Sequence, residues 1–201
     1  MILVDRQIEE AMERGEIAIT PYDPKCLGTN SYDVHLAPKL LTYQRFVDPK
    51  YADPLAQKLL GAGALLPLDC AKDNPTTEHE IPPEGFVLEP NVLYLASTIE
   101  YTRTENAVPM LNGRSSLGRL GLSVHVTAGT GDVGFFGHWT MELFVVHPLR
   151  VYAGMAIAQL LYFDASRPRC SYPQKQSAKY NNKSVEPGAS RLFRDFEKEK
   201  K

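Results

Sequence analysis

Two arginines and two serines gather in one short stretch of the chain, residues 113–119, which read Gly-Arg-Ser-Ser-Leu-Gly-Arg. Glycines near both ends allow backbone N–H groups to approach a ligand closely. A helical turn beginning near Ser115 would direct free N–H groups at an anion, and the guanidinium of Arg119 has the donor geometry that suits phosphate. The stretch predicts an anion-binding site, and it fits a surface turn with solvated arginines equally well.

A carboxylate lies in the middle of a predicted strand over residues 138–146. Alternation places Trp139 and Met141 on one face and Glu142 on the other, together with Phe144 and Val146. Glu142 is the sole acid of this strand, and its apolar neighbours predict a partly buried carboxyl whose raised pKa suits proton transfer. The alternative is a structural glutamate that is paired or faces solvent.

A histidine and an aspartate flank a glycine-rich turn at residues 123–132. Ser123, His125 and Thr127 share one face of an expected strand, and the turn that follows presents Asp132. An isolated histidine is more often structural than catalytic, so the turn raises the case for a site only modestly.

The polar tail carries a tyrosine and several lysines between Tyr172 and Lys183. Tyr172, Lys175, Lys179 and Lys183 could close over a polyphosphate as a lid. By composition, a solvated tail without fixed structure competes strongly with that interpretation.

The elements that must position these residues are mostly strands. Asp5 can cap a short helix that ends at Gly15, and residues 16–20 form a short strand. Clean alternation or β-branched and aromatic residues predict further strands at 30–36, 86–88, 93–99, 123–127, 139–146 and 157–163. We expect one mainly β domain over residues 1–201, a barrel or jelly-roll-like sandwich, with an insertion or long loop around 45–82 that holds one helix at most.

Composition limits the class of protein. The chain has 201 residues, of which 43% are hydrophobic, and a formal net charge of −2, which suits a compact domain and disfavours a protein that coats nucleic acid. Cys26, Cys70 and Cys170 are widely separated and form no Cys-x-x-Cys pair, so free thiols are expected and zinc is not. No basic leader and no apolar run near the ~20 residues of a membrane helix are present, so we expect a cytoplasmic protein.

The segments together resemble the dCTP deaminases of the dUTPase-like superfamily. The resemblance starts at residues 5–8 and 30–36, is strongest from Gly113 to Glu142, and resumes at 154–160 and 178–180; it leaves out mainly residues 45–82. It implies subunits with a distorted β-barrel and a few short helices, assembled as a homotrimer with each active site at a subunit interface. It also implies Mg²⁺ bound with the triphosphate, no metal held by the protein itself, and dTTP as an expected feedback inhibitor.

The resemblance assigns roles to residues. The implied catalytic residues are Glu142 and Ser115. Glu142 would take a proton from the water that attacks C4 of cytosine, without zinc, and Ser115 would lie near the cytosine. Arg119 would lie at the phosphates and Asp132 at the sugar. The implied nucleotide-binding residues are Arg114, Ser115, Ser116, Leu117, Gly118, Arg119, Asp132, Thr140, Met141, Glu142, Gln159, Tyr172, Lys179 and Lys183, with His125, Thr127 and Ala128 near the site.

Two departures from the family pattern stand out. The tail has Asn181, Asn182 and Lys183 where the family usually has a Gln, so Lys183 is a candidate phosphate ligand. Val133 replaces the proline that usually follows the aspartate.

The resemblance favours a deaminase that converts dCTP and water to dUTP and ammonia. The alternative is a bifunctional enzyme that also cleaves dUTP to dUMP and pyrophosphate, because Gly129 and Gln159 resemble those of bifunctional relatives. A plain dUTPase would leave Glu142 without a role and lacks support in the C-terminal sequence. A nucleotide sensor without catalysis would not need the complete set of Ser115, Arg119 and Glu142.

Overall fold

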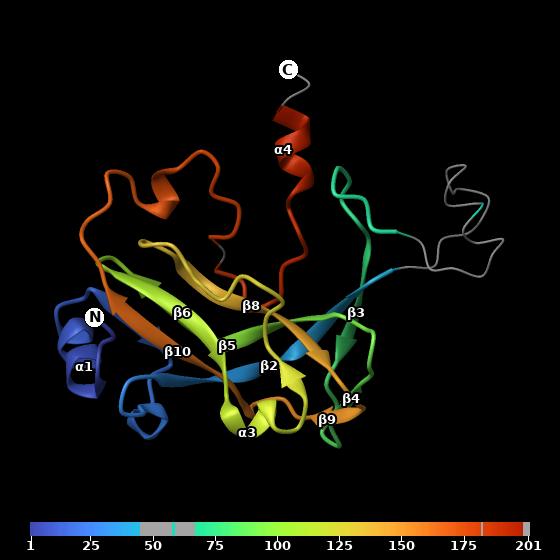
Figure 1. Ribbon diagram of the computed structural model, residues 1–201, viewed down its shortest axis with the longest axis horizontal. Helices are drawn as coiled ribbons and strands as arrows, with labels where there is room; N and C mark the ends of the chain where they lie inside the picture. The colour runs from blue at the N-terminus through green and yellow to red at the C-terminus, as the bar shows by residue number, and fades with distance from the viewer. Residues whose placement is uncertain (45–57, 59–66, 182, 199–201) are drawn as a thin grey trace.

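The computed structural model describes residues 1–44, 58, 67–181 and 183–198. It is built mainly of strands (Figure 1), in agreement with the mainly β class predicted above. The strands are β1 (Ile17–Thr20), β2 (Tyr32–Tyr43), β3 (Thr76–Glu80), β4 (Phe86–Leu88), β5 (Tyr94–Thr104), β6 (Ala107–Gly113), β7 (Leu122–Ser123), β8 (Phe136–Val145), β9 (Leu149–Val151) and β10 (Ala156–Asp164). The helices are α1 (Asp5–Glu13), α3 (Ser115–Gly118) and α4 (Phe193–Lys198), with 3₁₀ turns η1 (Pro24–Cys26) and η3 (Tyr172–Gln174).

One large antiparallel sheet forms the body of the molecule. Its strands follow the order β6-β10-β2-β5-β8-β7, with β1 paired to β5 and β3 paired to β2, and a separate pair joins β4 to β9. Register shifts interrupt the β2–β5, β5–β8 and β10–β2 ladders. Because such irregularities bend and twist strands, the sheet curls into the distorted barrel that Figure 1 shows.

The core lies on the inner face of the curled sheet. Alternate residues of β2 and β8, such as Val34, Leu36, Met141 and Leu143, have no exposed surface. On β8 their neighbours in sequence point outward, as period-two alternation requires, whereas on β2 the alternation breaks at Ala37, which is buried next to Leu36. α1 closes one end of the barrel by burying Ile8 completely. The same alternation that fills the core therefore places Thr140 and Glu142 on the opposite face of β8.

The N-terminal helix matches the expected position but not the expected cap. Asp5 is the first helical residue, and Val4 is the N-cap, whose N–H donates to the Gln7 side chain (3.1 Å). Asp5 instead accepts a bond from the Arg6 N–H (2.7 Å). An acid in the first turn is also favourable, because it lies at the positive end of the helix dipole.

Two β expectations were wrong in detail. The strand expected at 123–127 is reduced to Leu122–Ser123, after which the chain leaves the sheet as a loop. Residues 76–80, expected to be part of a long loop, form β3 and pair with β2. Residues 45–57 and 59–66, where a short helix was expected, lie outside the described part of the chain. β6 and β9 were not predicted.

The C-terminal segment departs from a structureless tail. It forms η3, runs back across the outer face of the barrel, and ends in α4, which projects away from the sheet (Figure 1). Within the described residues, no helix combines the length and the apolar character that crossing a membrane requires.

Candidate active site

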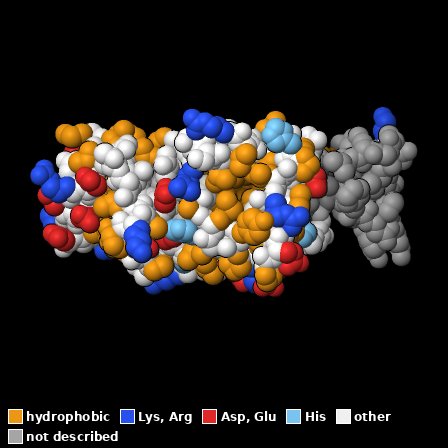
Figure 2. Space-filling view, turned by 90° about the horizontal axis from the view of Figure 1, so that it is seen from below, with side chains coloured by type: hydrophobic (Ala, Val, Ile, Leu, Met, Phe, Trp, Pro, Cys, Tyr) orange, Lys and Arg blue, Asp and Glu red, His pale blue; other side chains and the backbone are white. Residues whose placement is uncertain are grey.

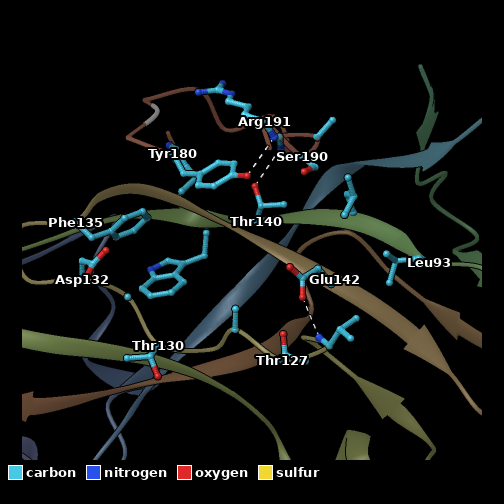
Figure 3. Close-up of a pocket in the computed structure, with 18 of the residues that line it drawn as sticks. Leu93, Thr127, Thr130, Asp132, Phe135, Thr140, Glu142, Tyr180, Ser190 and Arg191 are labelled. Carbon is cyan, nitrogen blue, oxygen red and sulfur yellow. Dashed lines mark hydrogen bonds between the residues drawn. The ribbon is translucent and has the colours of Figure 1, made fainter. Parts of the chain in front are cut away.

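A cavity of about 600 Å³ opens on the outer face of β8, and we call it the β8 pocket (Figure 3). Its size falls in the ~300–1,000 Å³ range of small-molecule sites. Most of its lining comes from β8, the loop at 126–132 and the C-terminal segment from Tyr180 to Arg191. The other lining residues are Tyr43, Leu93, Leu95, Phe135 and Tyr172. Of the residues expected from the sequence, the pocket brings together Thr127, Ala128, Asp132, Thr140, Glu142 and Tyr172.

Glu142 is half-buried and its carboxylate is held in place. The Val126 N–H donates to Glu142 Oε2 (2.9 Å), and the Glu142 N–H donates to the Val124 carbonyl (3.0 Å). The apolar neighbours on its face do not bury it as expected, since Phe144 is 41% and Val146 70% exposed. The loop, not the strand, therefore supplies the enclosure around this carboxylate.

Two glycines allow the loop at 126–132 to lie against the barrel. A Cβ on Gly129 would come within 2.6 Å of the Leu111 carbonyl oxygen and 2.9 Å of the His125 ring, and one on Gly131 would come within 2.6 Å of the Trp139 ring. The Leu111 N–H also donates to the Gly129 carbonyl (2.7 Å). Because no side chain fits there without a shift, the loop holds its place next to Glu142 through glycine.

Asp132 sits at the far end of the pocket from Glu142 in the view of Figure 3. A turn fixes it, in which the Phe135 N–H donates to the Asp132 carbonyl (3.0 Å) and Gly134 adopts φ +88°. The Phe135 ring then packs on Trp139 with centroids 4.8 Å apart. Without proline at 133, the turn still forms, because Gly134 supplies the left-handed residue.

Met141 and His125 are not available to a ligand in the pocket through their side chains. Met141 is completely buried in the core, so only its backbone could read a base edge. His125 is outside the pocket lining, and its Nδ1 is buried with no hydrogen-bond partner among the described residues.

A second group of residues surrounds α3, and we call it the α3 cluster: Asp33, Arg114, Ser115, Ser116, Arg119 and Gln159. All of these except Asp33 were expected at the site from the sequence. The predicted helical turn is confirmed as α3, with Ser115, Ser116, Gly118 and Arg119 exposed and Leu117 buried beneath them. Arg114 bridges to Asp33 (2.9 Å) and donates to the Ala156 carbonyl (3.3 Å), and Gln159 pairs in register with Asp33. None of the α3 cluster lines the β8 pocket.

The predicted lid is only partly in the pocket. The Tyr172 hydroxyl lines it and accepts bonds from the N–H groups of Lys179 and Tyr180 (3.1 Å each). Lys179 and Lys183 do not line it; the Lys179 ammonium pairs with Asp195, and Lys183 is exposed. Sequence reasoning missed Tyr43, Tyr180, Ser190 and Arg191, because distant segments meet at the pocket and no local pattern marks that meeting.

Metal-binding groups do not gather in the described residues: no set of three or more His, Cys, Asp or Glu is placed to hold an ion. Cys26, Cys70 and Cys170 are free thiols, as expected. Burial raises the pKa of the Cys26 thiol.

The chain forms a curled antiparallel barrel with an acidic pocket on β8 and a basic turn at α3. Comparison with known proteins identifies its family. The model of the dCTP deaminase-like family matches residues 2–165. The chain therefore belongs to this family of hydrolases that act on the C–N bond of cyclic amidines.

Similar proteins cover nearly the whole chain. The "dCTP deaminase, dUMP-forming" of Leptospira biflexa is 45% identical over 98% of this chain and 99% of its own length. The protein of the same name from Clostridium acetobutylicum is 44% identical over 98% and 99%. A crystal structure of 2'-deoxycytidine 5'-triphosphate deaminase from Agrobacterium tumefaciens aligns with a TM-score of 0.56 and 20% identity. That alignment covers 80% of this chain and 47% of the other, and supports the fold alone.

Proposed function

We propose that this protein deaminates dCTP hydrolytically and releases dUMP, with Glu142 as the general base. The observation that carries the proposal is the placement of Glu142: a half-buried carboxylate, oriented by the Val126 N–H, in a pocket that also contains Asp132 and Thr140. A general base must lie within hydrogen-bond reach of the water that it activates, in a site that excludes other water.

The deamination step follows from this geometry. Glu142 accepts a proton from water as the water oxygen attacks C4 of the cytosine ring. The same carboxyl then passes the proton to the exocyclic amine, the C4–N bond breaks and ammonia leaves. The proton of the new C4 hydroxyl moves to N3, which gives the uracil ring. Thr140 and Asp132 line the same pocket as the carboxylate, and Met141 precedes Glu142 on β8. We propose that Thr140 and the Met141 backbone contact the base edge and that Asp132 contacts the sugar hydroxyl.

The second part of the proposal concerns the end product. The sequence favoured dUTP as the product and kept dUMP as the alternative; the names of the similar proteins favour the alternative. Formation of dUMP requires a second water to attack the α-phosphorus, which breaks the α–β phosphoanhydride bond and releases pyrophosphate. The resemblance of Gly129 and Gln159 to the residues of bifunctional relatives also supports this alternative.

We also propose that the active site is completed by a neighbouring copy in a homotrimer. The β8 pocket contains the base but lacks the arginines and serines of the α3 cluster. Exposed apolar side chains occur at the end of β8, just after α3 and in the pocket loop, namely Phe144, Val146, Leu120 and Val126, at 41%, 70%, 52% and 55% exposed. Figure 2, seen from the α3 side, shows hydrophobic side chains gathered on this face. A ring of three head-to-tail contacts would cover such surface and bring one copy's α3 cluster to the next copy's pocket.

Magnesium enters the proposal with the nucleotide. Mg²⁺ prefers oxygen ligands and is commonly bound through substrate phosphates, so it would bridge phosphate oxygens. Asp132 and Glu142 lie at opposite ends of the pocket in the view of Figure 3. The described residues include no group of three or more His, Cys, Asp or Glu side chains placed to hold a metal ion. Feedback by dTTP, which would share the sugar and triphosphate contacts, is proposed on the resemblance alone.

A time course of products tests the proposed function. The protein is incubated with dCTP and Mg²⁺, and ammonia, dUTP, dUMP and pyrophosphate are quantified. Equal amounts of ammonia, dUMP and pyrophosphate are expected. Accumulation of dUTP without dUMP would contradict the cleavage of dUTP to dUMP and would favour a deaminase that stops at dUTP. Tight dCTP binding with no ammonia would overturn catalysis and favour a nucleotide sensor.

A further inference from the structure

The β8 pocket is poor in positive charge. Its described lining includes three acids, Asp132, Glu142 and Glu186, and a single Lys or Arg, Arg191. A nucleoside triphosphate carries several negative charges, which require cationic or N–H donors on the protein. If the pocket takes the substrate proposed above, on which this inference rests, Arg191 is the cation that this chain itself contributes to it.

The position of Arg191 is fixed by the tail on which it lies. The Arg191 N–H donates to the Tyr180 hydroxyl (3.1 Å), and its guanidinium lies 6.0 Å from the Tyr180 ring centroid and donates to the Lys179 carbonyl. Among the described residues no carboxylate pairs with this guanidinium. A guanidinium has five N–H donors, so most of them remain available to a ligand.

The barrel in turn holds the tail across the pocket. The Ser97 hydroxyl on β5 donates to the Val185 carbonyl, the Gly188 N–H donates to Thr140 Oγ1 on β8 (3.1 Å), and the Ser190 N–H donates to the Tyr43 hydroxyl on β2 (2.9 Å). Three strands therefore anchor the segment that presents Arg191. Figure 3 shows Arg191 and Tyr180 along one rim of the pocket, across from Thr127 and Thr130.

The other tail cations are less suited to the same role. Lys183, the candidate raised by the sequence, is exposed and outside the lining, and Lys179 is paired with Asp195. We propose that Arg191 binds the β- and γ-phosphates of the nucleotide substrate, in the role that the tail sequence suggested for Lys183. Because Arg191 also contacts Lys179 and Tyr180, phosphate binding would hold the tail closed over the base and sugar.

Affinity as a function of phosphate number tests this role. Binding of dCTP and dCMP is measured by calorimetry for the wild type, Arg191→Ala and Arg194→Ala. Arg194 is the matched control, an exposed arginine three residues further along the tail. We expect Arg191→Ala to weaken dCTP binding about 10- to 100-fold, the value of a charge-assisted hydrogen bond, and to leave dCMP binding within about twofold.

Each other outcome counts against the inference. Equal weakening of dCTP and dCMP would show that Arg191 only orders the tail, and an unchanged dCTP affinity would show that it does not reach the phosphates. Arg191→Lys keeps the positive charge but lacks the planar guanidinium with its paired N–H donors. It should therefore recover part of the dCTP affinity that Arg191→Ala loses. A wild-type protein that binds no dCTP would refute the proposed function itself, which distinguishes the two failures.

Discussion

The β8 pocket and the α3 cluster differ in charge as clearly as in position. Among the described residues, the pocket lining has Asp132, Glu142 and Glu186 with a single arginine from the tail. The α3 cluster instead presents Arg114, Arg119 and two serine hydroxyls on an exposed turn. The pocket suits proton transfer and a sugar hydroxyl, and the cluster suits an anion. Neither half alone offers everything that a nucleoside triphosphate requires, so the contrast itself argues for a shared site.

The two halves also differ in how they are held. Glu142 depends on a loop that packs through glycines, so its setting is sensitive to small changes in the loop. Arg114 is bonded to Asp33 and to the Ala156 carbonyl on neighbouring strands, which anchors α3 to the sheet. We therefore expect substitution of Glu142 to affect the chemical step and substitution of Arg119 to affect binding.

The largest effect is expected for Glu142→Gln. The amide keeps the size of the side chain but cannot accept the proton from water, so ammonia release should fall by about 10²–10⁴-fold or more. Release is measured by a coupled ammonia assay, with circular dichroism to verify the fold. Turnover within tenfold of the wild type would contradict the role of Glu142.

A smaller effect, on binding, is expected for Arg119→Ala. Loss of a charge-assisted hydrogen bond to phosphate should raise KM for dCTP about 10- to 100-fold and change kcat much less. Arg6→Ala is the control, because the Arg6 side chain on α1 is 81% exposed and pairs only with Glu10 among the described residues. A fall in kcat at unchanged KM would instead place Arg119 in the chemical step.

Gly129→Ala should act on stability. The added Cβ would meet the Leu111 backbone oxygen at 2.6 Å, and a backbone group cannot move aside as a flexible side chain can. Such overpacking costs about 1–3 kcal/mol. Urea unfolding at matched protein concentration measures it, with Gly113→Ala as the control, since the nearest atom there is 3.8 Å away. Equal stability of the two variants would refute the tight-loop argument.

The smallest effect, on thermal stability, is expected for Lys39, which pairs with Glu186 of the C-terminal segment. Hydrogen bonds with Glu186 (2.8 Å) and then Glu78 (3.1 Å) raise the pKa of Lys39 from 10.5 to about 12. A raised folded-state pKa means that the contact is fully present below about pH 10.5 and is lost as the pH rises through 12. The melting temperature of Lys39→Met should thus lie at most about 1–2 °C below that of the wild type at pH 8, since exposed ion pairs contribute little. The difference in melting temperature between Lys39→Met and the wild type should shrink toward pH 12. Lys25→Met is the control for the loss of one positive charge.

Sequence reasoning predicted several of the strands, among them β2, β8 and β10, and the α3 turn, because their signals are local. Alternation in β2 and β8 and glycines around Ser115 depend on a few neighbouring residues. The prediction was wrong at residues 124–127. Their β-branched side chains suggest a strand, but the chain leaves the sheet there and enters a loop whose glycines pack closely against the barrel. Sequence reasoning also missed Arg191, because its place beside the pocket depends on bonds to Tyr180 and on the Ser190 contact with Tyr43, far away in sequence.

The shared site is the central claim, and mixing two defective variants tests it most directly. Glu142→Gln and Arg119→Ala are unfolded together in equal amounts, refolded, and assayed with dCTP well below KM. If each site joins Glu142 of one copy to the α3 cluster of the next, random assembly restores about a quarter of the sites to the wild-type composition and the activity rises to that level. Activity no higher than the mean of the two variants alone would show that each chain builds its own site.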